Sequence, residues 1–409
     1  MMKVLHTADW HLGKRLQEFS RLEEQEQVLE EIIGIAEDEE VDLVILAGDI
    51  FDSFNPSHQA IELLFRSLRR LSKNGTRPII AIAGNHDSNQ LVEAPDPLAR
   101  ELGILFYADY DSVIKTGKLD SGVEIRNSEE GFVELKLPKH KEPVRIILAP
   151  YANEVRLKTY LGEDDREQEF RDRMQLRWKK LADKYMDSQG INLFAGHFFF
   201  VKEGETPEKE PESERPILHV GGTQALYTSN IPEAVQYSAL GHLHRYQVLG
   251  GAKGPAVYSS SPLAYSFSEA DQEKKVVSVY LEGDSEAEVT PIGLQKGRPL
   301  HRKRFSELKE ALDWLAENPY CFVELTYATT HSIDAQTRKA LFNAHDGIVN
   351  LIPEITDPSR MQQSSLHVDD LSKDMTELFE KYYESEKGIS PNPELTEIFK
   401  EVIAQKSES

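Results

Sequence analysis

Residues 43–52 read LVILAGDIFD, and this stretch decides the fold. Four consecutive apolar residues, Leu43 to Leu46, lead through a small-residue turn into Gly48 and Asp49. A short apolar run bounded by charge or glycine is typical of a strand that is buried on both faces. We therefore expect a buried strand that delivers a carboxylate at its carboxyl end, where α/β folds place their sites.

The same pattern recurs along the first 280 residues. Short apolar runs end abruptly in polar residues at Val4-Leu5, Ile79–Ile82, Ile146–Leu148 and Leu193–Ala195. Between the early runs, residues 22–36 and 60–71 place apolar side chains at helical spacing. This alternation of strands and helices indicates βαβ units, and hence an α/β domain.

The spacing changes in the second half of the chain. Tyr237–Leu240, Ala256–Tyr258 and Val276–Tyr280 are strand-like with little helix between them, which predicts a second, more antiparallel sheet. After an acidic run near 283, a helix at 306–316, a strand at 321–327 and a helix at 334–344 indicate a small α+β domain. The polar segment 204–216 predicts an exposed loop.

The C-terminal segment predicts a linker followed by two helices. Residues 353–370 are polar and contain proline, whereas 371–409 hold two short amphipathic patterns. Their apolar positions are Leu371, Met375, Leu378, Phe379 and Tyr382 in the first helix, and Leu395, Ile398, Phe399 and Val402 in the second. Isolated helices of this length are marginal in water. Their apolar faces either dock on their own domain or bind a partner protein.

Composition excludes several classes of protein. The 47 Lys and Arg residues against 70 Asp and Glu give a net charge of −23, which argues against coating DNA by bulk charge. Cys321 is the one cysteine, so disulfide frameworks are excluded and a reducing cytoplasm fits. We expect no membrane span and no signal peptide. The chain lacks both a GxxxxGK[ST] phosphate-binding loop and a GxSxG nucleophile motif.

Acidic, amide or imidazole side chains follow five of the apolar runs. They are Asp9 and His11; Asp49; Asn85, His86 and Asp87; His197; and His242 with His244. A lone aspartate after a strand is usually a turn or cap residue, and a lone histidine is usually an ordinary packed or surface residue. Five such groups at strand ends, beside aspartate or glycine, favour one shared site.

The donor types indicate a site for two divalent cations of intermediate hardness, because carboxylate, imidazole and amide oxygen occur without thiolate. Asp9 and His11 are two residues apart in extended chain, so both can reach one ion. His242 and His244 share this spacing and either bind one ion or divide between two. Asp49 is the expected bridge, since a carboxylate can offer one oxygen to each ion. Two such cations suit the hydrolysis of a phosphate ester.

The ordered motifs HTADWHLG, LAGDIFD, AGNHDS, FAGH and LGHLH resemble the calcineurin-like metallophosphoesterases and, more closely, their bacterial SbcD branch of double-strand-break repair nucleases. The resemblance covers most of the chain. It implies a four-layer α/β sandwich at 1–283 with a small α+β capping domain at 284–352. It also implies a DNA nuclease of repair, recombination and replication, with 3′–5′ exonuclease activity on duplex ends and endonuclease activity on single strands and hairpins.

Matching positions carry the roles of the family over to this chain. The resemblance implies one metal on Asp9, His11 and His244, a second metal on Asn85, His197 and His242, and Asp49 as the bridge. His86 would stabilise the transition state or protonate the leaving oxygen, and Asp87 would orient His86. The implied metal is Mn²⁺, although the ligand types are equally compatible with Fe or Zn.

Two features near the motifs concern the nucleic acid. Lys14 and Arg15 follow the first motif, and they either contact the phosphate backbone of DNA or are ordinary surface cations. Asp52 stands where archaeal and eukaryotic relatives carry a histidine. Any role of that histidine in the balance between exonuclease and endonuclease cleavage is therefore in doubt for this chain.

The resemblance also implies partners. The helices at 371–409 would bind the base of an SbcC-like coiled-coil ATPase, which supplies the phosphate-binding loop that this chain lacks. Helices near 57–71 and 90–101 would form a homodimer, and thus a heterotetramer with the ATPase, associated with the nucleoid in the cytoplasm. Two alternatives remain: a phosphodiesterase or nucleotidase of the same fold that acts on small molecules, and a non-catalytic scaffold.

Overall fold

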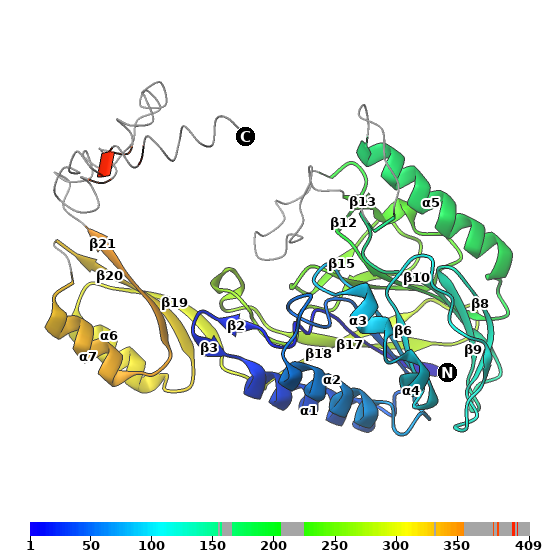
Figure 1. The fold of residues 1–409 in the computed structure, drawn as a ribbon, viewed down its shortest axis with the longest axis horizontal. Helices are drawn as coiled ribbons and strands as arrows, with labels where there is room; N and C mark the ends of the chain where they lie inside the picture. Colours follow the sequence, from blue (N-terminus) through cyan, green and yellow to red (C-terminus); the bar gives the residue numbers. More distant parts are fainter. Residues whose placement is uncertain are drawn as a thin grey trace. The chain divides into compact units, whose positions relative to one another are not determined.

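The structure is a computed structural model of the 409-residue chain, drawn in Figure 1. It describes residues 1–153, 156–157, 166–205, 225–330 and 333–355, and the single positions 379, 383, 395, 396 and 399. The chain divides into two compact units. The first comprises Met1–Arg302 with Tyr320–Glu324, and the second comprises Lys303–Pro319 with Leu325–Ser409.

A six-stranded sheet forms one half of the first unit. Its strands, in spatial order, are β18 (Glu288–Gly293), β17 (Lys275–Leu281), β1 (Met2–Thr7), β4 (Leu43–Ala47), β5 (Ile79–Ile82) and β6 (Ile104–Tyr107). Strands β1, β4, β5 and β6 pair in parallel, and β17 and β18 extend the sheet in antiparallel fashion. The parallel strands therefore end at one edge.

An eight-stranded sheet forms the other half. Its order is β15 (Gln247–Leu249), β16 (Ala256–Tyr258), β14 (Tyr237–Gly241), β11 (Ile191–His197), β10 (Val144–Ala149), β9 (Phe132–Lys136), β8 (Glu124–Glu129) and β7 (Gly117–Lys118). Strands β10, β11, β14 and β16 are parallel. Shorter pairs are β2 (Arg15–Leu16) with β3 (Phe19–Ser20) and β12 (Phe200–Val201) with β13 (Leu226–Tyr227).

Helices cover the outer faces of the two sheets. In Figure 1, α1 (Leu22–Asp38) and α2 (His58–Leu71) run side by side along one outer face, and α5 (Arg166–Tyr185) covers the opposite one. The short helices α3 (Asn89–Glu93) and α4 (Asp96–Glu101) precede β6, and the 3-10 turns η1 (Thr228–Asn230) and η2 (Phe267–Glu269) lie in loops. The expected four-layer α/β sandwich is confirmed.

Alternation along β4 shows how an apolar strand serves two cores. Leu43, Ile45 and Ala47 join the core between the two sheets, where they meet residues of the eight-stranded sheet. Val44 and Leu46 point to the other side and pack among the apolar residues of α1 and α2. A strand buried on both faces needs apolar residues at every position, which is why its sequence shows no alternation.

The second unit contains most of a three-stranded sheet and two helices. The sheet order is β19 (Leu300–Phe305), β20 (Phe322–Thr329) and β21 (Ile348–Ile355), and the unit holds the larger part of β20 and all of β21. Helices α6 (Leu308–Glu317) and α7 (Ala335–Ala344) pack on each other beside the sheet (Figure 1). These elements match the predicted helix–strand–helix pattern.

One prediction about the sheets was wrong. The strands after residue 235 do not form a separate, more antiparallel sheet: β14 and β16 extend the parallel set of β11, and β17 joins the six-stranded sheet beside β1. The connection between β14 and β16 contains the short strand β15 instead of a helix. The missing helix made a parallel crossover resemble an antiparallel arrangement.

The structure also divides the C-terminal half differently from the sequence. The predicted second domain begins at residue 284, whereas 284–302 belong to the first compact unit because β18 pairs with β17. The predicted linker begins at 353, but β21 continues to Ile355. Residues 356–370, most of 371–409 and the loop prediction at 206–216 lie outside the described residues.

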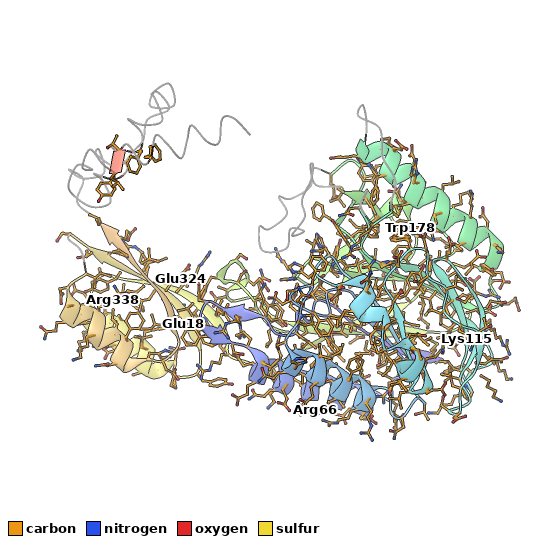
Figure 2. The ribbon with its side chains drawn as sticks, viewed as in Figure 1. Glu18, Arg66, Lys115, Trp178, Glu324 and Arg338 are labelled. Atoms are coloured by element: carbon orange, nitrogen blue, oxygen red, sulfur yellow. The ribbon has the colours of Figure 1, made fainter. Side chains whose placement is uncertain are left out.

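Trp178 on α5 provides a test of the outer layer (Figure 2). Its side chain is 1% exposed and its ring lies edge-on to Phe194, with ring centroids 4.9 Å apart. We expect Trp178→Ala to lower the free energy of unfolding by about 3–5 kcal/mol, because it leaves a cavity. Leu176→Ala on the same helix, where the side chain is 54% exposed, should cost less than about 0.5 kcal/mol. Denaturant titration measures both, and equal losses would contradict this packing.

Candidate metal centre

The carboxyl ends of five strands bring seven side chains together. They follow or end β1, β4, β5, β11 and β14, and each is at most 3% exposed: Asp9, His11, Asp49, Asn85, His197, His242 and His244. The two sheets contribute to the same site because their parallel strands all end on this side of the sandwich. The structure thus brings all seven predicted ligands into one buried cluster.

Unusual backbone geometry holds the loops in place. Asp9, His11 and Asp49 have φ angles of 55°, 43° and 48°, which are left-handed values uncommon outside glycine. The main-chain N–H of Asp9 donates to Gly48 O at 3.0 Å, and that of His11 donates to Asp49 O at 2.9 Å. A β-carbon on Gly84 would lie 2.1 Å from Asp49 Oδ1. Only glycine therefore allows this loop to approach Asp49 so closely.

The first ligand group consists of Asp9, His11 and His244. Potential ligand atoms of these residues all lie within 4.8 Å of one another. The two Nε2 atoms of His11 and His244 are 3.0 Å apart. The structure therefore places close together the three residues that the resemblance assigns to one metal.

The second group lies across Asp49. Asp9, Asp49 and His197 offer ligand atoms within 4.8 Å of one another. Asn85 Oδ1 is 3.0 Å from His197 Nε2 and 2.9 Å from His242 Nδ1. Asp49 Oδ2 is 3.5 Å from Nε2 of both His11 and His197, so this carboxylate lies between the two groups, as a bridge requires.

The buried charges favour cations. Burial raises the pKa of Asp9 to about 7, although His197 and His244 oppose the shift. Burial alone would lower the pKa of His197, but the Asp49 carboxylate beside it raises that pKa to about 9. Asp9 Oδ2 has no hydrogen-bond partner among the described residues. A buried, unsatisfied carboxylate oxygen beside imidazole nitrogens and an amide oxygen fits a divalent cation of intermediate hardness.

Hydrogen bonds behind the histidines fix which nitrogen faces the cluster. Nδ1 of His197 lies 2.8 Å from the main-chain oxygen of Ala47, and Nδ1 of His244 lies 3.1 Å from Glu269 Oε1. Both oxygens can act only as acceptors, so the hydrogen is on Nδ1 and Nε2 points at the other ligands. The sequence analysis missed Glu269, because SEADQEKK resembles an ordinary polar turn.

His86 is held beside the cluster by main-chain contacts. Its N–H donates to Asp49 Oδ1 at 2.8 Å, its Nδ1 lies 2.9 Å from the main-chain oxygen of Asp52, and its ring centroid is 4.7 Å from that of His11. Nε2 of His86 has no partner among the described residues.

Asp87 has a different contact from the predicted one. Its carboxylate accepts hydrogen bonds from the main-chain N–H groups of Gly84, Ile50 and Phe51, at 2.8, 3.0 and 2.9 Å. The predicted orientation of the His86 ring by Asp87 is therefore corrected, because the ring contact is made by Asp52. Asp87 instead ties the loop after β5 to the loop after β4. Arg156, also missed from the sequence, binds the main-chain oxygens of Gly84 and Asp87 at 2.9 and 2.8 Å.

The predicted DNA-contacting residues make contacts within the protein, and only part of the predicted partner-binding segment is described. Lys14 Nζ is 2.7 Å from Asp52 Oδ1, and the Arg15 guanidinium donates to the main-chain oxygen of Glu18. Of the predicted tail residues, Phe379, Leu395 and Phe399 are described, and Phe379 stacks on Phe399 with centroids 4.0 Å apart. Leu371, Met375, Leu378, Tyr382, Ile398 and Val402 lie outside the described residues.

Comparisons with known proteins show which family the chain resembles. The profile of the calcineurin-like phosphoesterase family matches residues 2–246, which include all seven clustered side chains. The SbcD component of the nuclease SbcCD from Bacillus subtilis is 33% identical over 411 residues, covering 98% of each chain. A solved dimetal phosphatase from Danio rerio has a TM-score of 0.36 and 13% identity, over 70% of this chain and 98% of that one. None of the helices in the described part of the chain has the length and apolar character needed to span a membrane.

The two pKa shifts predict that metal binding releases protons. Between pH 7 and pH 9 the metal-free chain carries a proton on His197, and as pH falls through 7 Asp9 gains one as well. A cation competes with both protons. We therefore expect the Mn²⁺ affinity to fall by about tenfold for each unit by which the pH is lowered, for each displaced proton. Calorimetric titration in buffers of different ionisation enthalpy measures this release. An affinity that stays constant across this range would contradict it.

Proposed function

We propose, from the premise that this chain belongs to the calcineurin-like phosphoesterase family and within it to the SbcD nucleases, that its seven clustered side chains hold two divalent cations. The chain is a metal-dependent nuclease of that type. The observation that carries the ligand assignment is the convergence of buried carboxylate, imidazole and amide atoms from five strand ends.

In this proposal each cation has its own ligands. Asp9, His11 and His244 hold one cation, Asn85, His197 and His242 hold the other, and Asp49 bridges them. When bound, such a pair supplies Lewis acidity that polarises a phosphodiester and eases deprotonation of water. We propose Mn²⁺ as the metal.

His86 is the proposed proton donor to the leaving oxygen. Because the main-chain oxygen of Asp52 can only accept, the hydrogen on Nδ1 stays in that contact and Nε2 is the atom that exchanges a proton. The contact between the His86 N–H and Asp49 Oδ1 ties the position of this histidine to the proposed bridging carboxylate. His86 therefore acts beside the cations without binding them.

The remaining parts of the chain have proposed roles in a larger assembly. We propose that 371–409 bind an SbcC-like ATPase, that the small α+β unit beginning at Lys303 caps the DNA, and that helices α2, α3 and α4 form a homodimer. The proposed substrates are duplex ends, cleaved 3′ to 5′, and single strands or hairpins, in the cytoplasm. Lys14 and Arg15 are proposed phosphate contacts, with the Lys14–Asp52 ion pair as a competing interaction.

Two substitutions separate metal binding from proton donation. Asp49→Ala should abolish both Mn²⁺ binding and cleavage of linear DNA, because it removes the shared carboxylate. His86→Ala should keep Mn²⁺ binding and slow cleavage by about 10²–10⁴-fold, the usual contribution of a general acid. Mn²⁺ titration and digestion of end-labelled DNA measure the two effects.

His140→Ala is the matched histidine control. Its ring lies 3.1 Å from Asp42, which precedes β4 and therefore sits at the strand end opposite to the cluster, so cleavage should be unchanged. Undiminished cleavage by His86→Ala would refute its proposed role. Faster hydrolysis of nucleotides than of DNA by the unmodified protein would favour the small-molecule alternative.

A truncation tests the proposed partner. Removal of residues 371–409 should eliminate association with an SbcC-like ATPase in a pull-down, because the amphipathic helices would be lost. Basal Mn²⁺-dependent cleavage should persist, since all clustered ligands precede residue 245. Association that survives the truncation would show that the partner binds elsewhere.

A further inference from the structure

We propose that Glu269 is a positioning residue for His244. Binding of one of the two cations would then depend on Glu269, although Glu269 is not itself a ligand. The inference rests on the proposed function, because it assigns Glu269 to the position formed by Asp9, His11 and His244. Glu269 lies in η2, is 2% exposed, and contacts the ring of His244.

Both carboxylate oxygens of Glu269 are fully engaged. Oε1 lies 3.1 Å from His244 Nδ1, and it also accepts the main-chain N–H of Tyr265 at 3.2 Å. Oε2 accepts a hydrogen bond from Lys274 Nζ at 2.6 Å and lies 3.3 Å from Ser261 Oγ. The Glu269 carboxylate is therefore held at both of its oxygens, and it cannot rotate away from the His244 imidazole.

Lys274 ties this carboxylate to the backbone of the same histidine. Its Nζ donates to Glu269 Oε2 at 2.6 Å, to the main-chain oxygen of His244 at 2.9 Å and to Ser261 Oγ at 3.0 Å. These three contacts use all three hydrogens of the ammonium group. The buried pair consequently holds His244 at both its ring and its backbone.

The contact determines what His244 can offer to a cation. A carboxylate acceptor keeps the hydrogen on Nδ1, so the lone pair is on Nε2, which lies 3.0 Å from His11 Nε2. The corresponding nitrogen of His197 is fixed by the main-chain oxygen of Ala47 at 2.8 Å. One position thus relies on a replaceable side chain, whereas the other uses the backbone of β4.

Glu269→Gln is the informative substitution because it preserves the shape of the side chain. The amide must direct its NH2 group at either Lys274 or His244 Nδ1, and both of those are donors. Unmodified protein should bind two Mn²⁺ per chain. The variant should bind one with unchanged affinity and the other about 10–100-fold more weakly, which is the usual cost of losing such a partner.

Two readouts distinguish positioning from general damage. In electron paramagnetic resonance with two equivalents of Mn²⁺ per chain, the unmodified chain should give the signal of an exchange-coupled pair, and Glu269→Gln should give mainly that of isolated Mn²⁺. Excess Mn²⁺ should restore both the coupled signal and DNA cleavage in the variant. A structural defect would not respond to added metal.

Glu134→Gln is the matched control. Glu134 is also buried, at 8% exposed, and it accepts Arg145 Nε at 3.0 Å and Asn127 Nδ2 at 2.9 Å, away from the cluster. The Glu134→Gln variant reports the cost of neutralising a buried, paired glutamate. The melting temperature of this variant should fall while its Mn²⁺ binding stays unchanged. Glu269→Asp, which keeps the charge opposite Lys274, should weaken the same cation less than Glu269→Gln and serves if the latter does not fold.

The outcomes separate this inference from the proposed function. If the unmodified chain bound fewer than two Mn²⁺ or failed to cleave DNA, the proposed function would fail first. If it bound two and cleaved, but Glu269→Gln and Glu269→Asp did the same with unchanged affinity, the positioning role alone would be overturned. Equal weakening of both cations would also overturn it.

Discussion

Parallel strands deliver their carboxyl ends to the same edge of a sheet, and in this protein two such sheets pack face to face. Alternate apolar residues of β1, β4 and β5 in one sheet and of β11 and β14 in the other form one core between the sheets. The polar residues that follow these strands consequently lie together in one buried region. That constraint concentrates two aspartates, an asparagine and four histidines where water is excluded.

Such a concentration is unfavourable without counter-charge. Desolvation penalises each ionised carboxylate, and the raised pKa of Asp9 is the direct consequence. In the metal-free chain, protonated His197 partly compensates because it donates to both the main chain of Ala47 and Asn85. A pair of divalent cations would replace that proton with a larger charge at the same atoms. The cluster therefore favours a cation of higher charge than a proton. The left-handed backbone angles of its loops keep the side chains in this arrangement.

The sequence was informative where chemistry and periodicity coincide along the chain. LVILAGDIFD predicts both a buried strand and a carboxylate at its end, and β4 with Asp49 has that form. Contacts between distant segments were not predictable in this way. Glu269 meets His244 from 25 positions away through a polar turn, and β14 and β16 reveal their parallel pairing only in space. The sequence-adjacent pair His86 and Asp87 misled for the same reason: neighbours in a tight loop point to different partners.

The acidic chain also explains how a polyanion would be selected at this centre. A net charge of −23 argues against long-range attraction of DNA by the bulk surface. Three cations near the cluster are engaged within the protein, Lys14 with Asp52, Lys274 with Glu269, and Arg156 with main-chain oxygens, whereas Arg245, which follows His244 in the chain, is exposed. These internal contacts stabilise the scaffold, and the Lys14–Asp52 ion pair competes with any contact of Lys14 to a phosphate. In the proposed function, affinity for phosphate would therefore come mainly from the divalent cations, with the proposed contacts of Lys14 and Arg15 as a local addition.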